Sequence, residues 1–93
     1  MALRRYGNQR DANEHEIIRV LEQAGCTVIK LDTPVDLAVG RCTPRGPRTF
    51  FLEVKTEKGK LTPDQVEFFD TWKGHAAIVR NEDEALKAIG VLR

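Results

Sequence analysis

Residues 35–55 read VDLAVGRCTPRGPRTFFLEVK, and this stretch decides the fold. Its two ends, 35–40 and 49–55, are rich in the branched and aromatic residues that strands prefer, whereas the middle, 41–48, contains two prolines and a glycine. We therefore predict a β-hairpin whose loop spans 41–48. Alternate positions on the two strands form one apolar core face, made of Val35, Leu37, Val39, Phe50, Leu52 and Val54.

The other face of this hairpin is expected to carry three chemically active side chains. The centre of the loop falls between Pro44 and Arg45, so a symmetric antiparallel hairpin puts Asp36 opposite Glu53. Directly opposed residues point to the same face, with β-carbons roughly 4.5–5.5 Å apart. Lys55 lies two residues beyond Glu53 and shares its face. Two carboxylates and one ammonium group should therefore lie together.

The sequence outside the hairpin predicts three helices and two further strands. The first helix has an apolar stripe and stops at Gly25, and the second begins with the strong start signal Thr62-Pro63-Asp64-Gln65. The expected elements are a helix over 13–24, a strand over 26–31, a helix over 62–74, a strand over 76–79 and a helix over 81–89. The order α-β-β-β-α-β-α predicts an α/β sandwich with a mixed sheet.

Length and composition predict one globular domain. The chain has 93 residues, of which 41% are hydrophobic and 31% charged. This predicts a single domain over 11–93, preceded by a basic arm over 1–10. The chain has no apolar run long enough for a membrane span and no secretory signal, and Cys26 and Cys42 form no metal-binding pattern. We expect a cytoplasmic protein, in a bacterium or a phage-infected cell, with free thiols and no membrane partner.

Positive charge is concentrated in two stretches. Residues 41–60 carry six lysines and arginines against two glutamates, and residues 1–13 carry three arginines against one aspartate. Such clusters can form an electrostatic footprint for a phosphate backbone, although a solvated basic loop explains them equally well. The candidate phosphate contacts are Arg41, Arg45, Arg48, Lys58 and Lys60, with Arg4, Arg5 and Arg10 in the arm.

Opposed carboxylates beside a lysine suit metal-dependent hydrolysis. Asp36 and Glu53 would repel each other unless a cation lay between them, and Mg²⁺ (or Mn²⁺) meets that need while binding substrate phosphate. A metal-bound water then becomes the nucleophile, and Lys55 can orient it or offset charge in the transition state. The alternative is a surface salt bridge between Glu53 and Lys55, which would be worth little.

These motifs resemble a known nuclease superfamily. Pro34-Val35-Asp36 followed by Glu53-Val54-Lys55 resembles the signature of the PD-(D/E)xK nucleases, with Val35 as a departure between the proline and the aspartate. The runs FLEVKT at 51–56 and GKLTPDQ at 59–65 resemble the VRR-NUC branch, which includes small stand-alone proteins of phages. The first helix is similar to that of archaeal Holliday-junction resolvases. The resemblance covers residues 11–90 and implies a restriction-endonuclease-like αβββαβ core, a mixed sheet flanked by helices, with an extra C-terminal helix.

The resemblance also implies roles for individual residues. Glu14, Asp36 and Glu53 would hold the ions, helped by the Val54 carbonyl. The family's helical glutamate maps best to Glu14, with Glu16 as the competitor. Either glutamate could instead be a capping partner, Glu14 for Asp11 and Glu16 for Asn13. Gln65 matches the family's helix-start glutamine, and a capping partnership with Thr62 is an equally good explanation that could hold at the same time.

The implied activity is a Mg²⁺- or Mn²⁺-dependent DNA endonuclease without any small-molecule cofactor. A chain this small has little room for a sequence-reading domain, which favours recognition of branched DNA, including Holliday junctions. The resolvase resemblance implies a homodimer. The alternatives are a nuclease of phage packaging or restriction that nicks ordinary duplex, and a non-catalytic DNA- or protein-binding module of the same fold.

Overall fold

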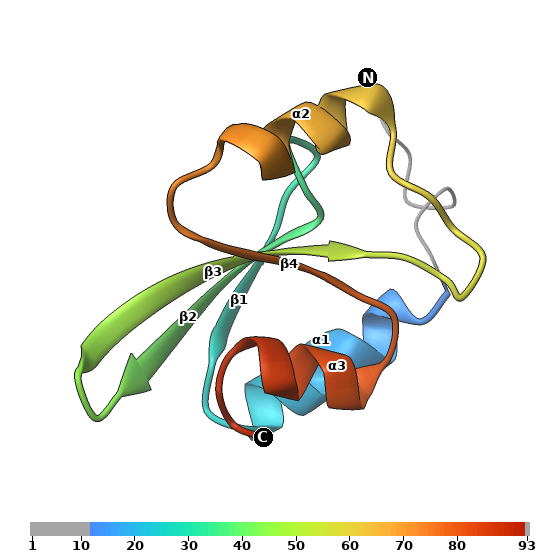
Figure 1. Ribbon diagram of the computed structural model, residues 1–93. Helices are drawn as coiled ribbons and strands as arrows, with labels where there is room; N and C mark the ends of the chain where they lie inside the picture. The colour runs from blue at the N-terminus through green and yellow to red at the C-terminus, as the bar shows by residue number, and fades with distance from the viewer. Residues whose placement is uncertain (1–11, 93) are drawn as a thin grey trace.

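The structure is a computed structural model that describes residues 12–92. This part of the chain forms an α/β fold of three helices and a four-stranded mixed sheet (Figure 1). The expected order of elements is confirmed. The elements are α1 (Glu14–Gln23), β1 (Thr27–Lys30), β2 (Leu37–Thr43), β3 (Gly46–Val54), α2 (Pro63–Thr71), β4 (His75–Val79) and α3 (Glu82–Ala88).

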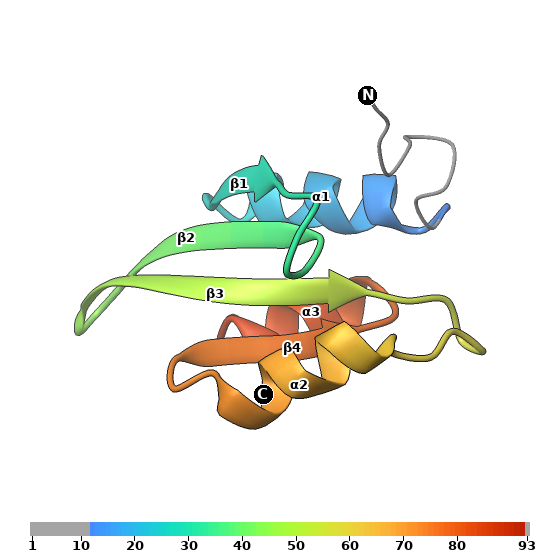
Figure 2. The same cartoon turned by 90° about the horizontal axis from the view of Figure 1, so that it is seen from above.

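The sheet lies between two helical layers. Its strands are ordered β1-β2-β3-β4, with β1–β2 and β2–β3 antiparallel and β3–β4 parallel. Helices α1 and α3 lie on one face, and α2 lies on the other (Figure 1). Seen from above, α2 lies over the β4 side of the sheet, while α1 lies toward β1 (Figure 2). Both faces of the β3–β4 half are therefore covered.

The β2–β3 hairpin has the register predicted from the sequence but a much shorter turn. Leu37 pairs with Leu52, and the ladder continues to Thr43 opposite Gly46. The prediction of a loop over 41–48 is therefore wrong, because only residues 44 and 45 lie outside the strands. Gly46 adopts a φ of 108°, which a residue with a side chain rarely reaches, and the Thr43 hydroxyl donates to its carbonyl at 2.6 Å. These contacts allow the chain to reverse within two residues.

The predicted apolar face forms the core beneath α1 and α3. Leu37, Val39 and Leu52 are fully buried, and Ile17 and Leu21 pack on them from α1. The six side chains that the sequence assigned to this face are all buried. This confirms that the period-two pattern of the hairpin sets which face meets the helices.

Helix α2 packs on the opposite face through aromatic rings. Phe68 and Trp72 contact Phe51 of β3, with ring centroids 6.0 and 5.0 Å apart. Trp72 remains 45% exposed, and no residue of α2 is fully buried. These aromatic side chains form a half-covered layer that is separate from the main core. The helix ends at Thr71, three residues before the predicted end at Gly74, because Trp72 adopts an extended conformation.

The sequence also predicts the state of the two cysteines and the absence of a membrane-spanning helix. Cys26 and Cys42 are free thiols, as expected. Burial raises the pKa of the Cys26 thiol, although the Arg41 charge opposes this, whereas Cys42 is exposed. Across residues 12–92, no helix combines the length and the apolar character needed to cross a bilayer.

Replacing Leu52 with alanine should lower the free energy of unfolding by roughly 2–5 kcal/mol, because the change leaves a cavity under the helices. Ile29→Ala is the matched control, since Ile29 is 56% exposed on β1. It should cost less than about 1 kcal/mol. Urea unfolding followed by Trp72 fluorescence measures both values, and equal losses would contradict the placement of Leu52 in the core.

Candidate active site

Asp36 and Glu53 lie across from each other where β2 begins and β3 ends. The last ladder pair toward this end is Leu37 with Leu52, so one further step of the register sets Asp36 opposite Glu53. The Asp36 Oδ2 atom accepts a hydrogen bond from the Val54 backbone N–H at 2.9 Å. Both residues are buried: Asp36 has 2% of its surface exposed, and Glu53 has 1%. The two predicted carboxylates therefore occupy one protected region.

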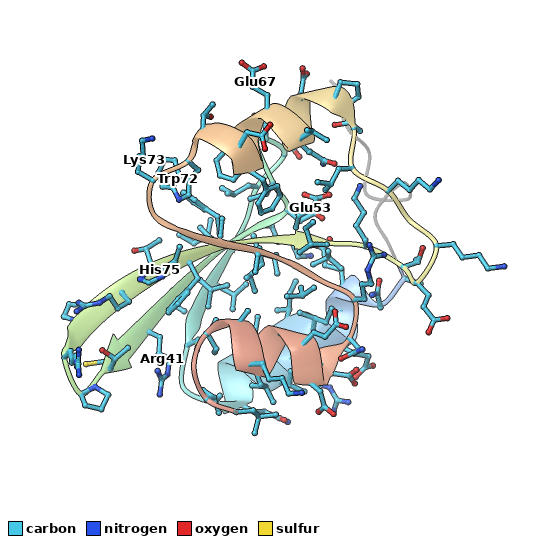
Figure 3. All side chains as sticks on the ribbon, in the orientation of Figure 1. Arg41, Glu53, Glu67, Trp72, Lys73 and His75 are labelled. Carbon is cyan, nitrogen blue, oxygen red and sulfur yellow. The ribbon has the colours of Figure 1, made fainter. Side chains whose placement is uncertain are left out.

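Lys55 and Gln65 converge on the Glu53 carboxylate. The Lys55 Nζ atom lies 3.1 Å from Glu53 Oε2, and the Gln65 Nε2 atom donates to the same oxygen at 2.8 Å. The Lys55 side chain is only 15% exposed, so solvent screens this ion pair less than it would screen a surface pair. Figure 3 shows Glu53 between the sheet and α2, the helix that supplies Gln65.

Gln65 performs both roles that the sequence left open. Its backbone N–H donates to Thr62 Oγ1 at 3.3 Å, and its Oε1 accepts from the Thr62 backbone N–H at 3.0 Å. This is a capping box with Pro63 in the first turn. Because Oε1 faces the helix start, Nε2 is directed at Glu53. The local start signal of α2 therefore also orients a donor toward the buried carboxylate.

Glu14 is the buried glutamate of α1, and Glu16 is not. Glu14 is 4% exposed, whereas Glu16 forms a surface ion pair with Arg19 at 2.6 Å. The hydrogen bond and charge of Arg19 lower the pKa of the Glu16 carboxyl. The proposed capping of Asn13 by Glu16 is wrong, since Asn13 makes no side-chain cap. The other alternative, with Asp11, lies outside the described residues.

Asn13 instead joins α1 to the ends of two strands. Its side-chain amide donates to the Lys55 carbonyl at 3.1 Å and to the Arg80 carbonyl at 2.7 Å. Lys55 directly follows β3, and Arg80 directly follows β4. The start of α1, and with it the backbone of Glu14, is therefore held beside the residue that contacts Glu53.

The arginines of the hairpin lie at the other end of the strands from Glu53. Arg41 pairs with Arg48 near the turn, and the Arg41 guanidinium donates to the Ile89 carbonyl after α3. Figure 3 shows Arg41 toward α3 and Glu53 toward α2. Arg48 is five residues from Glu53, which is roughly 17 Å along a strand. Phosphate contacts by Arg41, Arg45 and Arg48 remain a prediction, but the structure does not bring these side chains to Glu53.

The basic loop after β3 lies nearer to the carboxylates. Lys58 and Lys60 are exposed in the segment that joins Lys55 to α2. Sequence reasoning missed Arg80, whose guanidinium holds this loop through three backbone carbonyls, those of Thr56, Glu57 and Gly59. No local pattern links Arg80 to the loop, since their contacts span 21 to 24 residues. Arg4, Arg5 and Arg10 of the expected basic arm lie outside the described residues.

The Asp36 and Glu53 carboxylates are oxygen donors of the kind that a hard divalent cation prefers, whereas Glu14 is carried by α1, the helix on the face of the sheet opposite α2. Among residues 12–92, the buried polar or charged residues are Glu14, Asp36 and Glu53, all of them carboxylates. Burying carboxylates is costly unless cations or hydrogen-bond donors offset their charge, and Mg²⁺ prefers oxygen ligands of this kind. In the same part of the chain, no group of three or more His, Cys, Asp or Glu side chains forms a ready-made metal site.

Comparisons of the chain with family models, curated proteins and solved structures found no match. The resemblance of residues 34–36 and 53–55 to a nuclease signature is therefore an expectation from sequence alone. The geometry around Glu53 carries the functional argument that follows.

Replacing Gln65 with glutamate should lower the free energy of unfolding by roughly 1–3 kcal/mol at pH 7. The new side chain keeps an oxygen for the Thr62 N–H but sets a second carboxylate against Glu53. Acid should reduce the loss, because protonating the introduced carboxyl at position 65 restores a donor toward Glu53. Urea titrations at pH 7 and at acid pH test this, with Gln23→Glu on the exposed end of α1 as the control. A loss that does not change with pH would contradict the charge repulsion.

Proposed function

We propose that this chain is a metal-dependent nuclease of the PD-(D/E)xK type that hydrolyses phosphodiester bonds in DNA. The observation that carries the proposal is the pair of buried carboxylates, Asp36 directly before β2 and Glu53 in β3, with the Lys55 ammonium 3.1 Å from Glu53. These residue types are the ones that the proposed chemistry requires. The α-β-β-β-α-β order of the elements adds support.

Each residue has a definite part in this proposal. Asp36 and Glu53, with the Val54 carbonyl and Glu14, would hold Mg²⁺ or Mn²⁺. The bound ion supplies a more acidic water and neutralises charge on the phosphate. Lys55 orients the attacking water or donates to the phosphate oxygens as negative charge develops. Gln65 donates to Glu53 and thereby fixes the orientation of that carboxylate.

The surface salt bridge considered from the sequence fits the observations less well. A surface pair is exposed and contributes little, whereas Glu53 is 1% exposed and receives two donors on one oxygen. A purely structural role is also poorly served by buried carboxylates, because apolar residues of similar size would often be as stable or more so. The burial of both Asp36 and Glu53 therefore favours chemistry over support.

The position of the positive charges suggests how DNA would approach. Lys58 and Lys60 follow the Lys55 segment directly and are exposed. They are the candidate contacts for phosphates next to the scissile bond, and such contacts position the backbone without reading sequence. We propose branched DNA as the preferred substrate and a homodimer as the active form, the arrangement in which two sites reach one junction.

Glu53→Gln and Asp36→Asn should each reduce cleavage by roughly 100-fold or more, because each removes a charge needed to hold the ion and stabilise the transition state. The assay uses labelled four-way junction, flap and linear duplex DNA, with Mg²⁺, with Mn²⁺ or with chelator. Cleavage should require the divalent ion and be fastest on branched DNA.

Glu67→Gln is the control for these variants, since Glu67 projects from the outer side of α2, away from the sheet (Figure 3). It should cleave like the wild type. Wild-type rates from Glu53→Gln would overturn the metal-site proposal. Metal-independent DNA binding without any cleavage would favour the non-catalytic module, and equal rates on duplex and junction would favour the nicking enzyme.

Lys58→Ala and Lys60→Ala should each weaken DNA binding and reduce the slope of log affinity against log salt by about 1, because each lysine releases counterions from one phosphate. Lys30→Ala, at an exposed position on β1, should leave the slope unchanged. Fluorescence anisotropy at several salt concentrations, with calcium in place of magnesium, measures the slope. Unchanged slopes for both loop variants would rule out this approach of the DNA.

A further inference from the structure

We propose that Arg80 and Gly59 are positioning residues that hold the Lys55 side chain against Glu53. Arg80 belongs to neither the predicted carboxylate set nor the predicted phosphate contacts, and it lies 25 positions after Lys55. The assignment of a catalytic consequence to this contact rests on the proposed nuclease function. The positioning itself rests only on contacts within the protein.

Arg80 holds the loop after β3 in place through hydrogen bonds to its backbone. Its Nη1 atom donates to the carbonyls of Thr56 and Gly59, the latter at 3.0 Å, and the Glu57 carbonyl shares one of the two protons at 3.3 Å. Three carbonyl oxygens turned toward one guanidinium fix the path of the backbone over these four residues. A further bond from the Gly59 N–H to the Thr56 carbonyl, at 3.0 Å, tightens the turn.

This loop in turn lies close to the stem of Lys55. A β-carbon added at Gly59 would lie 3.3 Å from Lys55 Cδ and 3.4 Å from Lys55 Cβ. A side chain at position 59 would therefore press on the methylene groups of Lys55, which would have to shift by a few tenths of an ångström. With its stem confined on this side, Lys55 extends so that Nζ lies 3.1 Å from Glu53 Oε2.

The backbone of Arg80 is itself held by hydrogen bonds to two helix starts. Its carbonyl accepts from the Asn13 amide at 2.7 Å, and its N–H donates to Glu84 Oε1 at 2.8 Å. Asn13 also donates to the Lys55 carbonyl. Arg80 is thus tied to the starts of α1 and α3, and the same amide of α1 fixes the backbone of Lys55. A lysine side chain has a flexible four-carbon stem. Its confinement therefore sets the fraction of time that the Lys55 ammonium group spends in contact with Glu53.

The test measures Lys55 directly, through its rate of amine labelling by a water-soluble acylating reagent, read peptide by peptide by mass spectrometry. Arg80→Gln and Gly59→Ala should each raise the Lys55 rate by about threefold or more, because loss of local order exposes the amine. Lys30, on the exposed strand β1, should label at the wild-type rate throughout. Arg80→Lys keeps a cationic donor and should fall between wild type and Arg80→Gln.

Arg19→Gln is the matched control, an arginine on the exposed side of α1. Thermal unfolding of each variant checks that it folds, and Gly59→Ala provides a second route to Lys55 if Arg80→Gln is unstable. In the nuclease assay, Arg80→Gln and Gly59→Ala should lower kcat roughly 10-fold, since they misplace Lys55. KM should rise as well, because the same loop carries Lys58 and Lys60. Arg80→Lys should recover part of kcat.

The two measurements separate the possible failures. Unchanged Lys55 labelling in folded Arg80→Gln and Gly59→Ala would overturn the positioning role, whatever their activity. Raised labelling together with a wild-type protein that cleaves no DNA would support the positioning and reject the nuclease. Raised labelling with unchanged kcat would show that Lys55 is held in place but is not needed for the reaction, and would overturn the proposed catalytic consequence.

Discussion

A shift of one residue in the pairing of β2 with β3 would turn one strand over relative to the other. Leu37 would then lie opposite Glu53, so that either Leu37 would turn away from α1 and α3 or Glu53 would turn into the apolar core. The observed register avoids both, because Leu37, Val39, Phe50, Leu52 and Val54 occupy alternate positions and all turn to the core face, which leaves Glu53 on the other face. The burial of the apolar face therefore fixes the placement of the carboxylates, and the site on the α2 side depends on it.

Burial of Asp36 and Glu53 costs stability, although the proposed chemistry requires both carboxylates. Asp36 and Glu53 are buried where carboxylates are costly, and the protein offsets that cost with a backbone N–H, an amide and one ammonium group. Two of these donors come from elements whose positions are fixed for another reason: Val54 by the sheet and Gln65 by the helix cap. In this way residues 12–92 hold buried charged groups beside a four-stranded sheet.

Where sequence reasoning was wrong, non-local contacts decided the outcome. The long loop expected over 41–48 is a two-residue turn, because pairing across the strands continues through Pro47 to Gly46. Pro47 is tolerated there since β4 pairs with β3 only from Phe50 onward, which leaves one side of the strand unpaired. Similarly, the side chain of Asn13 bridges two strand ends instead of capping its own helix, since those carbonyls lie within its reach only after folding.

The sequence by itself determined the order of the elements, the register of the hairpin, the apolar face and the double role open to Gln65. These features follow from spacing along the chain, since the strand period and the capping geometry act over a few residues. The preference for Glu14 over Glu16 was already present in the sequence, whereas only the tertiary structure decided that the hairpin arginines lie away from Glu53 and that Arg80 and Gly59 confine Lys55. Those relations join segments that are distant along the chain, and packing of the helices on the twisted sheet brings them together.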